Sequence, residues 1–294
     1  MTSKHLAFAV MATIWGLTWI AIKTGVDALP PFLFASTRLL AAGTFLLLLA
    51  RLRGATLSMN GSLGRVVAAA ILVNTVTYGT LFWGMQHIPS GLSSIVNLAL
   101  IPVGLFTIGL AAGEETYSRR KVGAIALGVS GLVVLFLPKL SFEGDGLALF
   151  AMVALVVGTL AYCWGSILSR PLLRTLAPLA LSGWLTLIGG TGLFALALLF
   201  EPIDATTLSA FLELPVVGSW LFLVLGGSVI AFTLYLRLLR DWGPTRAGLY
   251  AFVSPIIAVV LGVFVFDEPF GAYEIVGSTI MLAAAALAMQ RDTE

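Results

Sequence analysis

Residues 97–115, NLALIPVGLFTIGLAAGEE, return in outline as residues 250–268, YAFVSPIIAVVLGVFVFDE, at an offset of 153. Each stretch is apolar, carries a proline at its sixth position (Pro102 or Pro255) and ends in an acidic pair. A second match, at an offset of 149, relates Trp15 to Trp164, each followed by glycine. The sequence therefore predicts two similar halves, residues 1–140 and 141–294.

The composition of these halves excludes a soluble globular protein. Of the 294 residues, 59% are apolar and only 10% are charged, where a soluble domain carries about 25% charged residues. The mean hydropathy is +1.04, so the chain is predicted to be an all-α polytopic membrane protein in contact with membrane lipid. The net charge of +2 is too small to indicate a nucleic-acid partner. A single cysteine, Cys163, excludes an intrachain disulfide.

Apolar runs of about 20 residues, the length that crosses about 30 Å of hydrocarbon, predict ten transmembrane helices. The first run is too long, and lacks the cleavage site, for a signal peptide. The ten runs lie near residues 5–24, 32–50, 66–86, 90–111, 122–138, 146–168, 179–200, 216–236, 245–266 and 271–290.

The distribution of Lys and Arg predicts the orientation of these helices. With the N-terminus inside, thirteen of the sixteen basic residues fall in cytoplasmic loops, so both termini are predicted to be cytoplasmic. Five helices per half is an odd number, so the second half enters the membrane from the opposite face and the halves form an inverted repeat. Such repeats suit alternating access, with Pro102 and Pro255 as hinges or, alternatively, as kinks tolerated by packing.

These features resemble the EamA type of the drug/metabolite transporter superfamily. The resemblance rests on the ten helices in two halves, the Trp15-Gly16 pair, Arg38 within the run STRLLA, and the acidic ends of the fourth and ninth helices. It implies a bacterial inner-membrane carrier, most often an exporter of amino acids, and the aromatic-rich sequence is most similar to exporters of aromatic amino acids. Because members of the superfamily also export cationic drugs and other metabolites, a multidrug exporter of the same fold is the alternative.

Candidate substrate-binding residues are aromatic or polar groups deep within the predicted helices. Helical spacing aligns Trp15 with Trp19, and likewise aligns Asn74, Tyr78 and Phe82. Buried polar groups face protein or a wet cavity, because an unpaired polar group in hydrocarbon is costly. The candidates are Trp15, Trp19, Arg38, Asn74, Tyr78, Phe82, Asn97, Tyr162, Trp164 and Tyr250.

Several of these candidates have a structural alternative. Inverted symmetry would bring Trp15 and Trp164 to comparable places near the central axis, although both could instead fill helix grooves. Arg38 either pairs with a substrate carboxylate or ties together carbonyl groups at neighbouring helix ends. The acidic residues 114–115 and 267–268 are expected to cap helices or form gate ion pairs, the first with Arg119 and Arg120.

The sequence carries no phosphate-binding loop, no His-Glu-x-x-His and no Cys-x-x-Cys, so no cofactor, metal or catalytic residue is predicted. A secondary or facilitated transporter of a small molecule is therefore favoured. A channel would need a polar stripe or rings of charge, and an intramembrane enzyme would need a nucleophile with its base at membrane depth. Glycine-rich helices would allow a monomer or a homodimer.

Overall fold

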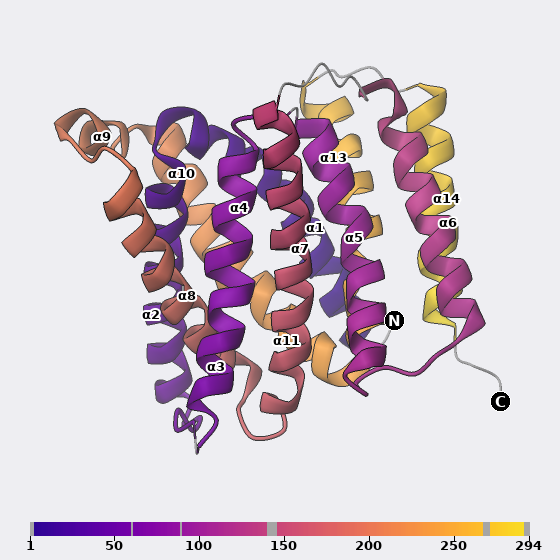
Figure 1. The fold of residues 1–294 in the computed structure, drawn as a ribbon, viewed down its shortest axis with the longest axis horizontal. Coiled ribbons are helices and arrows are strands. Elements are labelled where there is room, and N and C mark those ends of the chain that lie inside the picture. The colour runs from indigo at the N-terminus through magenta and orange to yellow at the C-terminus, as the bar shows by residue number, and fades with distance from the viewer. Residues whose placement is uncertain (1–2, 60, 89, 140–145, 267–270, 291–294) are drawn as a thin grey trace.

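The structure is a computed structural model that describes residues 3–59, 61–88, 90–139, 146–266 and 271–290. These residues form helices and connecting loops, with no strand among them (Figure 1). The first half contains α1 (Ser3–Ala28), α2 (Pro31–Leu52), α3 (Leu63–Ala70), η1 (Ile71–Val76), α4 (Thr77–Gly84), α5 (Ser90–Ala111), α6 (Arg119–Phe136) and η2 (Leu137–Lys139).

The second half follows the same order with two additional short helices. It contains α7 (Gly146–Leu172), α8 (Pro178–Phe200), α9 (Ala205–Ala210), α10 (Leu214–Phe222), η3 (Leu223–Phe232), α11 (Thr233–Trp242), α12 (Pro244–Gly248), α13 (Tyr250–Phe266) and α14 (Ala272–Met289). The segments α3-η1-α4 and α10-η3-α11 are continuous rods.

Seven helices in the described ranges are long and apolar enough to cross a membrane, which confirms the prediction of a polytopic membrane protein. Two shorter apolar helices, Val96–Ala111 and Pro244–Val260, accompany them. Each of the ten predicted runs falls on helical structure where it is described, but the count of ten spans and the cytoplasmic termini stay predictions. The seven are Ser3–Ala28, Pro31–Leu52, Leu63–Gly84, Gly146–Leu172, Pro178–Phe200, Leu214–Trp242 and Ala272–Met289.

Helix starts follow the proline positions, as expected from a residue that fixes φ and lacks an N–H donor. Pro31 and Pro178 begin α2 and α8. The first turn of α2 is also capped from the other half of the chain, because Glu201 accepts hydrogen bonds from the backbone N–H groups of Phe32 and Leu33 at 2.6 and 2.7 Å. This carboxylate ties the end of α8 to the start of α2.

A few helix pairs make the most extensive contacts between elements. The longest interfaces join α2 to α8 and α6 to α14, which stand at opposite sides of Figure 1. Between them, α1 packs against α13, and α5 packs against α7. Glycines allow the close approach: a Cβ on Gly43 of α2 would lie 2.6 Å from the backbone nitrogen of Leu187 in α8.

Two rods contain wide π-helical turns, which the apolar pattern of the sequence does not predict. Segment η1 interrupts the α3-η1-α4 rod, and η3 interrupts the α10-η3-α11 rod. In η1 the Thr77 hydroxyl oxygen lies 2.7 Å from the carbonyl oxygen of Leu72, five residues earlier, and 3.1 Å from that of Gly158 in α7. A π-helical turn leaves a carbonyl group without its usual backbone donor, and the Thr77 hydroxyl satisfies that carbonyl group.

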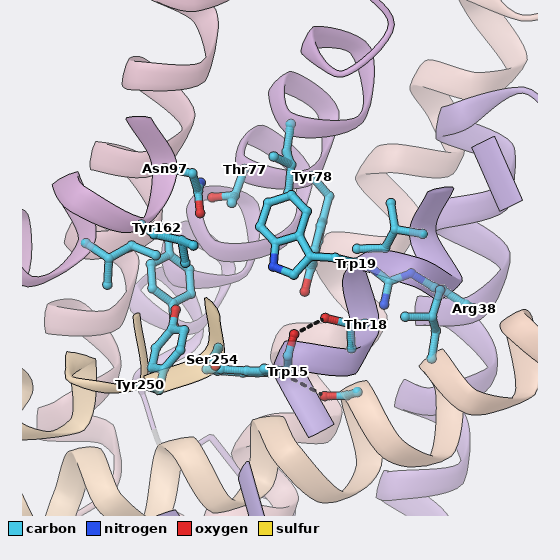
Figure 2. Close-up of a pocket in the computed structure, with 16 residues that line it drawn as sticks. Trp15, Thr18, Trp19, Arg38, Thr77, Tyr78, Asn97, Tyr162, Tyr250 and Ser254 are labelled. Carbon is cyan, nitrogen blue, oxygen red and sulfur yellow. Dashed lines mark hydrogen bonds between the residues drawn. The ribbon is translucent and has the colours of Figure 1, made fainter. Parts of the chain in front are cut away.

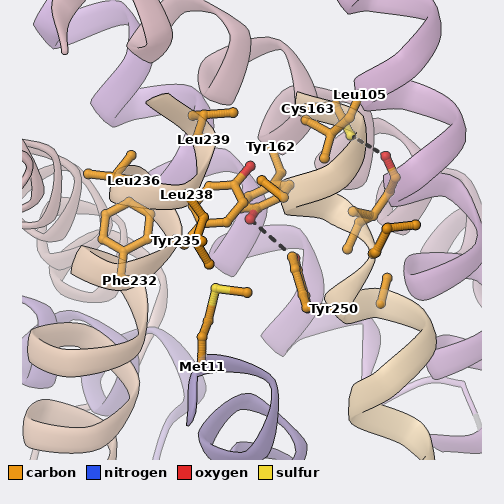
Figure 3. Close-up of a cluster of buried hydrophobic side chains, with 14 of the residues drawn as sticks. Met11, Leu105, Tyr162, Cys163, Phe232, Tyr235, Leu236, Leu238, Leu239 and Tyr250 are labelled. Atoms are coloured by element: carbon orange, nitrogen blue, oxygen red, sulfur yellow. Dashed lines mark hydrogen bonds between the residues drawn. The ribbon is translucent and has the colours of Figure 1, made fainter. Parts of the chain in front are cut away.

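The apolar core divides into two clusters. The first, drawn in part in Figure 3, includes Met11, Tyr162, Tyr235 and Tyr250. The second lies among α1, α2, α4, α8 and the α10-η3 rod, and includes Phe34 and Phe82. The half-buried Trp19 packs against both clusters, so the boundary between them lies beside its ring.

Candidate functional site

A cavity of about 100 Å³ lies where the two core clusters meet. This volume holds about three water molecules, whereas small-molecule sites commonly measure about 300–1,000 Å³. The cavity in this conformation is therefore smaller than a site that holds a substrate. It must open further before a substrate can bind. The lining residues are Trp15, Thr18, Trp19, Ile22, Arg38, Thr77, Tyr78, Leu81, Asn97, Leu98, Ile101, Tyr162, Leu223, Gly227, Tyr250 and Ser254.

Aromatic side chains from α1, α7 and α13 form one wall of the cavity (Figure 2). The rings of Trp15 and Tyr250 meet edge to face with centroids 4.3 Å apart. The hydroxyl groups of Tyr250 and Tyr162 are 3.1 Å apart, and the Trp15 Nε1 donates to the carbonyl oxygen of Gly227 at 3.3 Å. Fully buried Tyr235 supports this wall from behind, 5.4 Å from the Trp15 ring. The surface of this wall is mainly apolar, but it also carries the hydroxyl groups of Tyr162 and Tyr250.

Three polar side chains of the lining are held by hydrogen bonds to the protein. The Ser254 hydroxyl donates to the carbonyl of Ala12 at 2.9 Å, and the Thr18 hydroxyl donates to that of Trp15 at 2.7 Å. The Asn97 amide donates to the Thr159 hydroxyl at 3.0 Å. Each hydroxyl oxygen keeps lone pairs that can accept a hydrogen bond from a ligand.

Arg38 lies on α2 with only 2% of the residue exposed. Its guanidinium carbon lies 4.6 Å from the centroid of the Tyr78 ring and 5.5 Å from that of Phe82. Its Nε and Nη2 atoms have no hydrogen-bond partner in the described part of the chain. The interpretation that Arg38 ties together helix-end carbonyls would require such bonds, and these two atoms make none in the described part of the chain.

A second polar cluster, which we call the latch, consists of Glu114, Glu115, Lys121, Arg170 and Thr245. Glu115 Oε1 lies 2.7 Å from Lys121 Nζ, and its Oε2 accepts from the hydroxyl and backbone N–H of Thr245 at 2.5 and 3.1 Å. Glu114 pairs with Arg170 at 2.9 Å. Arg170 and Thr245 belong to the second half, so the latch joins the two halves.

The latch confirms that the first acidic pair forms ion pairs, but the predicted partners were wrong. The sequence suggested Arg119 and Arg120, whereas the structure uses Lys121 and Arg170. The reason is geometric: α6 begins at Arg119, and its first turn directs Lys121 back toward the preceding loop. The second acidic pair, residues 267–268, lies outside the described residues.

The latch is expected to resist mild acid. Burial raises the pKa of the Glu115 carboxyl, but hydrogen bonds from Lys121, Thr245 and the backbone outweigh burial, so its pKa lies below its usual value. A carboxyl group with a lowered pKa stabilises the fold fully above the unfolded pKa, about 4.3 for Glu, and loses this contribution as the pH falls through the folded pKa.

The difference in melting temperature between the unmodified chain and Glu115→Gln should therefore stay constant at neutral and mildly acidic pH, and should shrink only below about pH 4. Thermal unfolding in detergent over a pH series measures this difference. A difference that already closes between about pH 7 and pH 5.5 would contradict the lowered pKa.

Comparison with known proteins assigns the family. The model of the EamA-like transporter family matches residues 2–137 and, separately, residues 149–290. This chain belongs to the EamA-like transporter family. Together the two matched segments cover most of the chain.

Curated relatives of this EamA-like transporter include proteins named as transporters. The uncharacterized inner membrane transporter YedA of Escherichia coli is 28% identical over 284 residues, covering 96% of this chain and 89% of YedA. Protein PecM of Dickeya dadantii is 26% identical over 288 residues, covering 97% and 91%. One solved crystal structure superposes with a TM-score of 0.79 at 18% identity, covering 98% of both chains, and so shares the fold. These relatives argue against an enzyme.

Seven of the ten predicted substrate-binding residues of this EamA-like transporter line the cavity. Three do not. Asn74 donates to the carbonyl of Leu185 at 2.9 Å and joins η1 to α8, and Phe82 is fully buried behind Arg38. Trp164 is 52% exposed on the outer face of α7, so it does not mirror Trp15. The seven are Trp15, Trp19, Arg38, Tyr78, Asn97, Tyr162 and Tyr250.

Sequence reasoning missed several lining residues that helical spacing could have identified. Thr18 is three residues after Trp15 and shares its helix face. Ser254 is four residues after Tyr250 and precedes Pro255. Gly227 could not be identified from the sequence, because it acts through its backbone carbonyl, which accepts the hydrogen bond from Trp15.

Proposed function

We propose that this EamA-like transporter is a secondary carrier that exports amino acids, with aromatic and other neutral ones favoured, or related small metabolites across the bacterial inner membrane. The observation that carries the proposal is the cavity, because both family-matched segments contribute to it: Trp15 and Tyr78 come from the first, and Tyr162 and Tyr250 from the second. Aromatic walls with few polar anchors suit a ligand with an apolar body and a polar head. We propose on the same grounds that the chain is an exporter of the same type as the aromatic amino acid exporter YddG.

Alternating access between inverted halves is the mechanism that we propose. The repeated family match supports it. The helix contacts support it as well, since exchanging the halves converts the α1–α13 contact into the α7–α5 contact. The wide turns η1 and η3 also begin 152 residues apart, at Ile71 and Leu223. In this scheme Pro102 and Pro255 serve as hinges, and the latch closes one side of the cavity.

A continuous pore fits the cavity less well. Its lining alternates large aromatic and aliphatic side chains and carries no ring of like charges in the described part of the chain, as a selective channel would require. No described carboxylate lines the cavity either. We therefore propose facilitated diffusion or exchange, in which the substrate gradient drives net export.

Uptake of radiolabelled Phe, Trp, Thr and Met into proteoliposomes tests the proposal. We expect saturable uptake, and we expect Trp15→Ala to reduce it about tenfold, because the edge-to-face contact with Tyr250 and the cavity wall are lost. The matched control is Trp164→Ala, which removes the same side chain from an exposed position and should leave uptake unchanged.

Absence of saturable uptake for all four amino acids would contradict the amino acid assignment. Equal losses in Trp15→Ala and Trp164→Ala, with unchanged size-exclusion profiles, would contradict the assignment of the cavity as the transport site.

A further inference from the structure

Arg38 is a buried charge, and two of its three guanidinium nitrogens have no hydrogen-bond partner among the residues that the structure describes. Arginine keeps its charge at any accessible pH, and no described carboxylate forms an ion pair with it. Leaving buried donors unpaired is costly, and an intramembrane charge normally faces a partner or a wet cavity. Arg38 faces a cavity, because it is one of the lining residues.

The two unpartnered nitrogens are adjacent on the guanidinium group. Nε and Nη2 carry parallel N–H bonds along one edge of the planar fork, and this edge matches the two oxygens of a carboxylate. The Tyr78 and Phe82 rings contact the guanidinium group, with their centroids 4.6 and 5.5 Å from its carbon. These aromatic contacts stabilise the cation without accepting its N–H bonds. The Nε–Nη2 edge is buried and unpaired in this narrow conformation, so a ligand reaches it when the cavity opens.

We propose that Arg38 binds the carboxylate head of the transported molecule through this edge. The inference rests on the proposed function and adds the substrate class: a carboxylate attached to an apolar or aromatic body. Figure 2 shows Trp19 between Arg38 and the Tyr162–Tyr250 pair, so the body of the substrate extends from Arg38 past Trp19 toward that wall.

The charge of the cavity also disfavours the alternative substrate class, organic cations. Arg38 is the one charged residue among the lining residues that the structure describes. Helix α8, the counterpart of α2 in the second half, contains no charged residue at all. A cation without a carboxylate would therefore meet a like charge with no opposing acid, whereas an amino acid brings its own carboxylate.

Ligand-induced thermal stabilisation of the purified full-length chain tests the inference without relying on transport. The probes are phenylalanine, 3-phenylpropionate, which lacks the ammonium group, and phenethylamine, which lacks the carboxylate. Sodium chloride at equal ionic strength reports binding of a simple anion. We expect phenylalanine and phenylpropionate to stabilise the protein, and phenethylamine and chloride to have no effect.

Variants at Arg38 locate the binding group. Arg38→Gln should weaken phenylpropionate binding about 10- to 100-fold, and Arg38→Lys, which keeps the charge but lacks the fork, about tenfold. Without any probe, Arg38→Gln should melt at or above the temperature of the unmodified chain, because an unpaired buried charge is removed. Trp164→Ala is the control that should bind normally.

Four results would overturn the inference: equal stabilisation by phenethylamine, equal stabilisation by chloride, no stabilisation by either carboxylate, or undiminished phenylpropionate binding in both Arg38 variants. A large loss of probe-free stability in Arg38→Gln would also overturn it, because that result marks a structural role. Arg38-dependent binding without saturable uptake in proteoliposomes would instead overturn the proposed transport function alone.

Discussion

Replacing Glu115 with alanine is expected to lower the free energy of unfolding by about 3–5 kcal/mol, the usual cost of removing one partner from a buried ion pair. The side chains of Glu115 and Lys121 are each only 9% exposed, and their charged atoms are 2.7 Å apart. The variant would leave the Lys121 ammonium and the Thr245 hydroxyl and N–H without their acceptor. Thermal unfolding in detergent measures the loss.

Two comparisons make this prediction specific. Asp27→Ala removes the acid from an equally close pair, with Lys23 at 2.6 Å, but those side chains are 61% and 58% exposed. Exposed pairs contribute about 0–1 kcal/mol, so this variant should change little. The double variant Glu115→Ala/Lys121→Ala should recover part of the loss, because it leaves no unpaired ammonium. Equal losses in Asp27→Ala and Glu115→Ala would contradict the interpretation.

The second large effect is expected at Gly277, where α14 crosses α6. A Cβ at this position would lie 2.7 Å from the backbone nitrogen of Leu135 and 2.8 Å from the carbonyl oxygen of Gly131. Backbone atoms cannot rotate away, so Gly277→Ala must push the two helices apart. We expect a loss of about 1–3 kcal/mol, as for other overpacked interiors, measured by thermal unfolding in detergent.

The matched control is Gly123→Ala on α6 of the same pair. No atom lies within 4 Å of a Cβ built on Gly123, and alanine favours a helix over glycine by about 0.5–1 kcal/mol. The control should therefore be neutral or stabilising. If Gly277→Ala melts at the same temperature as Gly123→Ala, the α6–α14 interface is looser than described.

The polytopic helical fold could be predicted from the sequence because apolar run length is a property of the chain alone. The direction in which a side chain points is harder to predict from the sequence. Trp15 and Trp164 occupy matching sequence positions, yet one lines the cavity and the other is 52% exposed, because the direction depends on how each helix is rotated against its neighbours. Sequence symmetry gives no information about such rotation.

Residues of the candidate site could be predicted from the sequence where a polar side chain lies deep within a predicted transmembrane helix. Arg38, Asn97 and Tyr250 were identified because their polar groups need a protein partner or a wet cavity, and the structure places all three on the lining. The same reasoning selected Asn74, whose amide instead satisfies a helix carbonyl. Membrane depth identifies polar groups that need a partner, but the fold decides whether a ligand or a backbone group supplies that partner.

The wide turn η1 also sets the rotation, about the helix axis, of every residue that follows it along the α3-η1-α4 rod. In a helix with about 3.6 residues per turn, one residue more or less rotates the remainder by about 100° about the axis. Winding Ile71–Val76 as regular α-helix at unchanged length would therefore rotate Tyr78 away from the guanidinium group that its ring contacts at 4.6 Å. The aromatic ring that contacts the buried charge is thus aimed by a local irregularity of backbone winding.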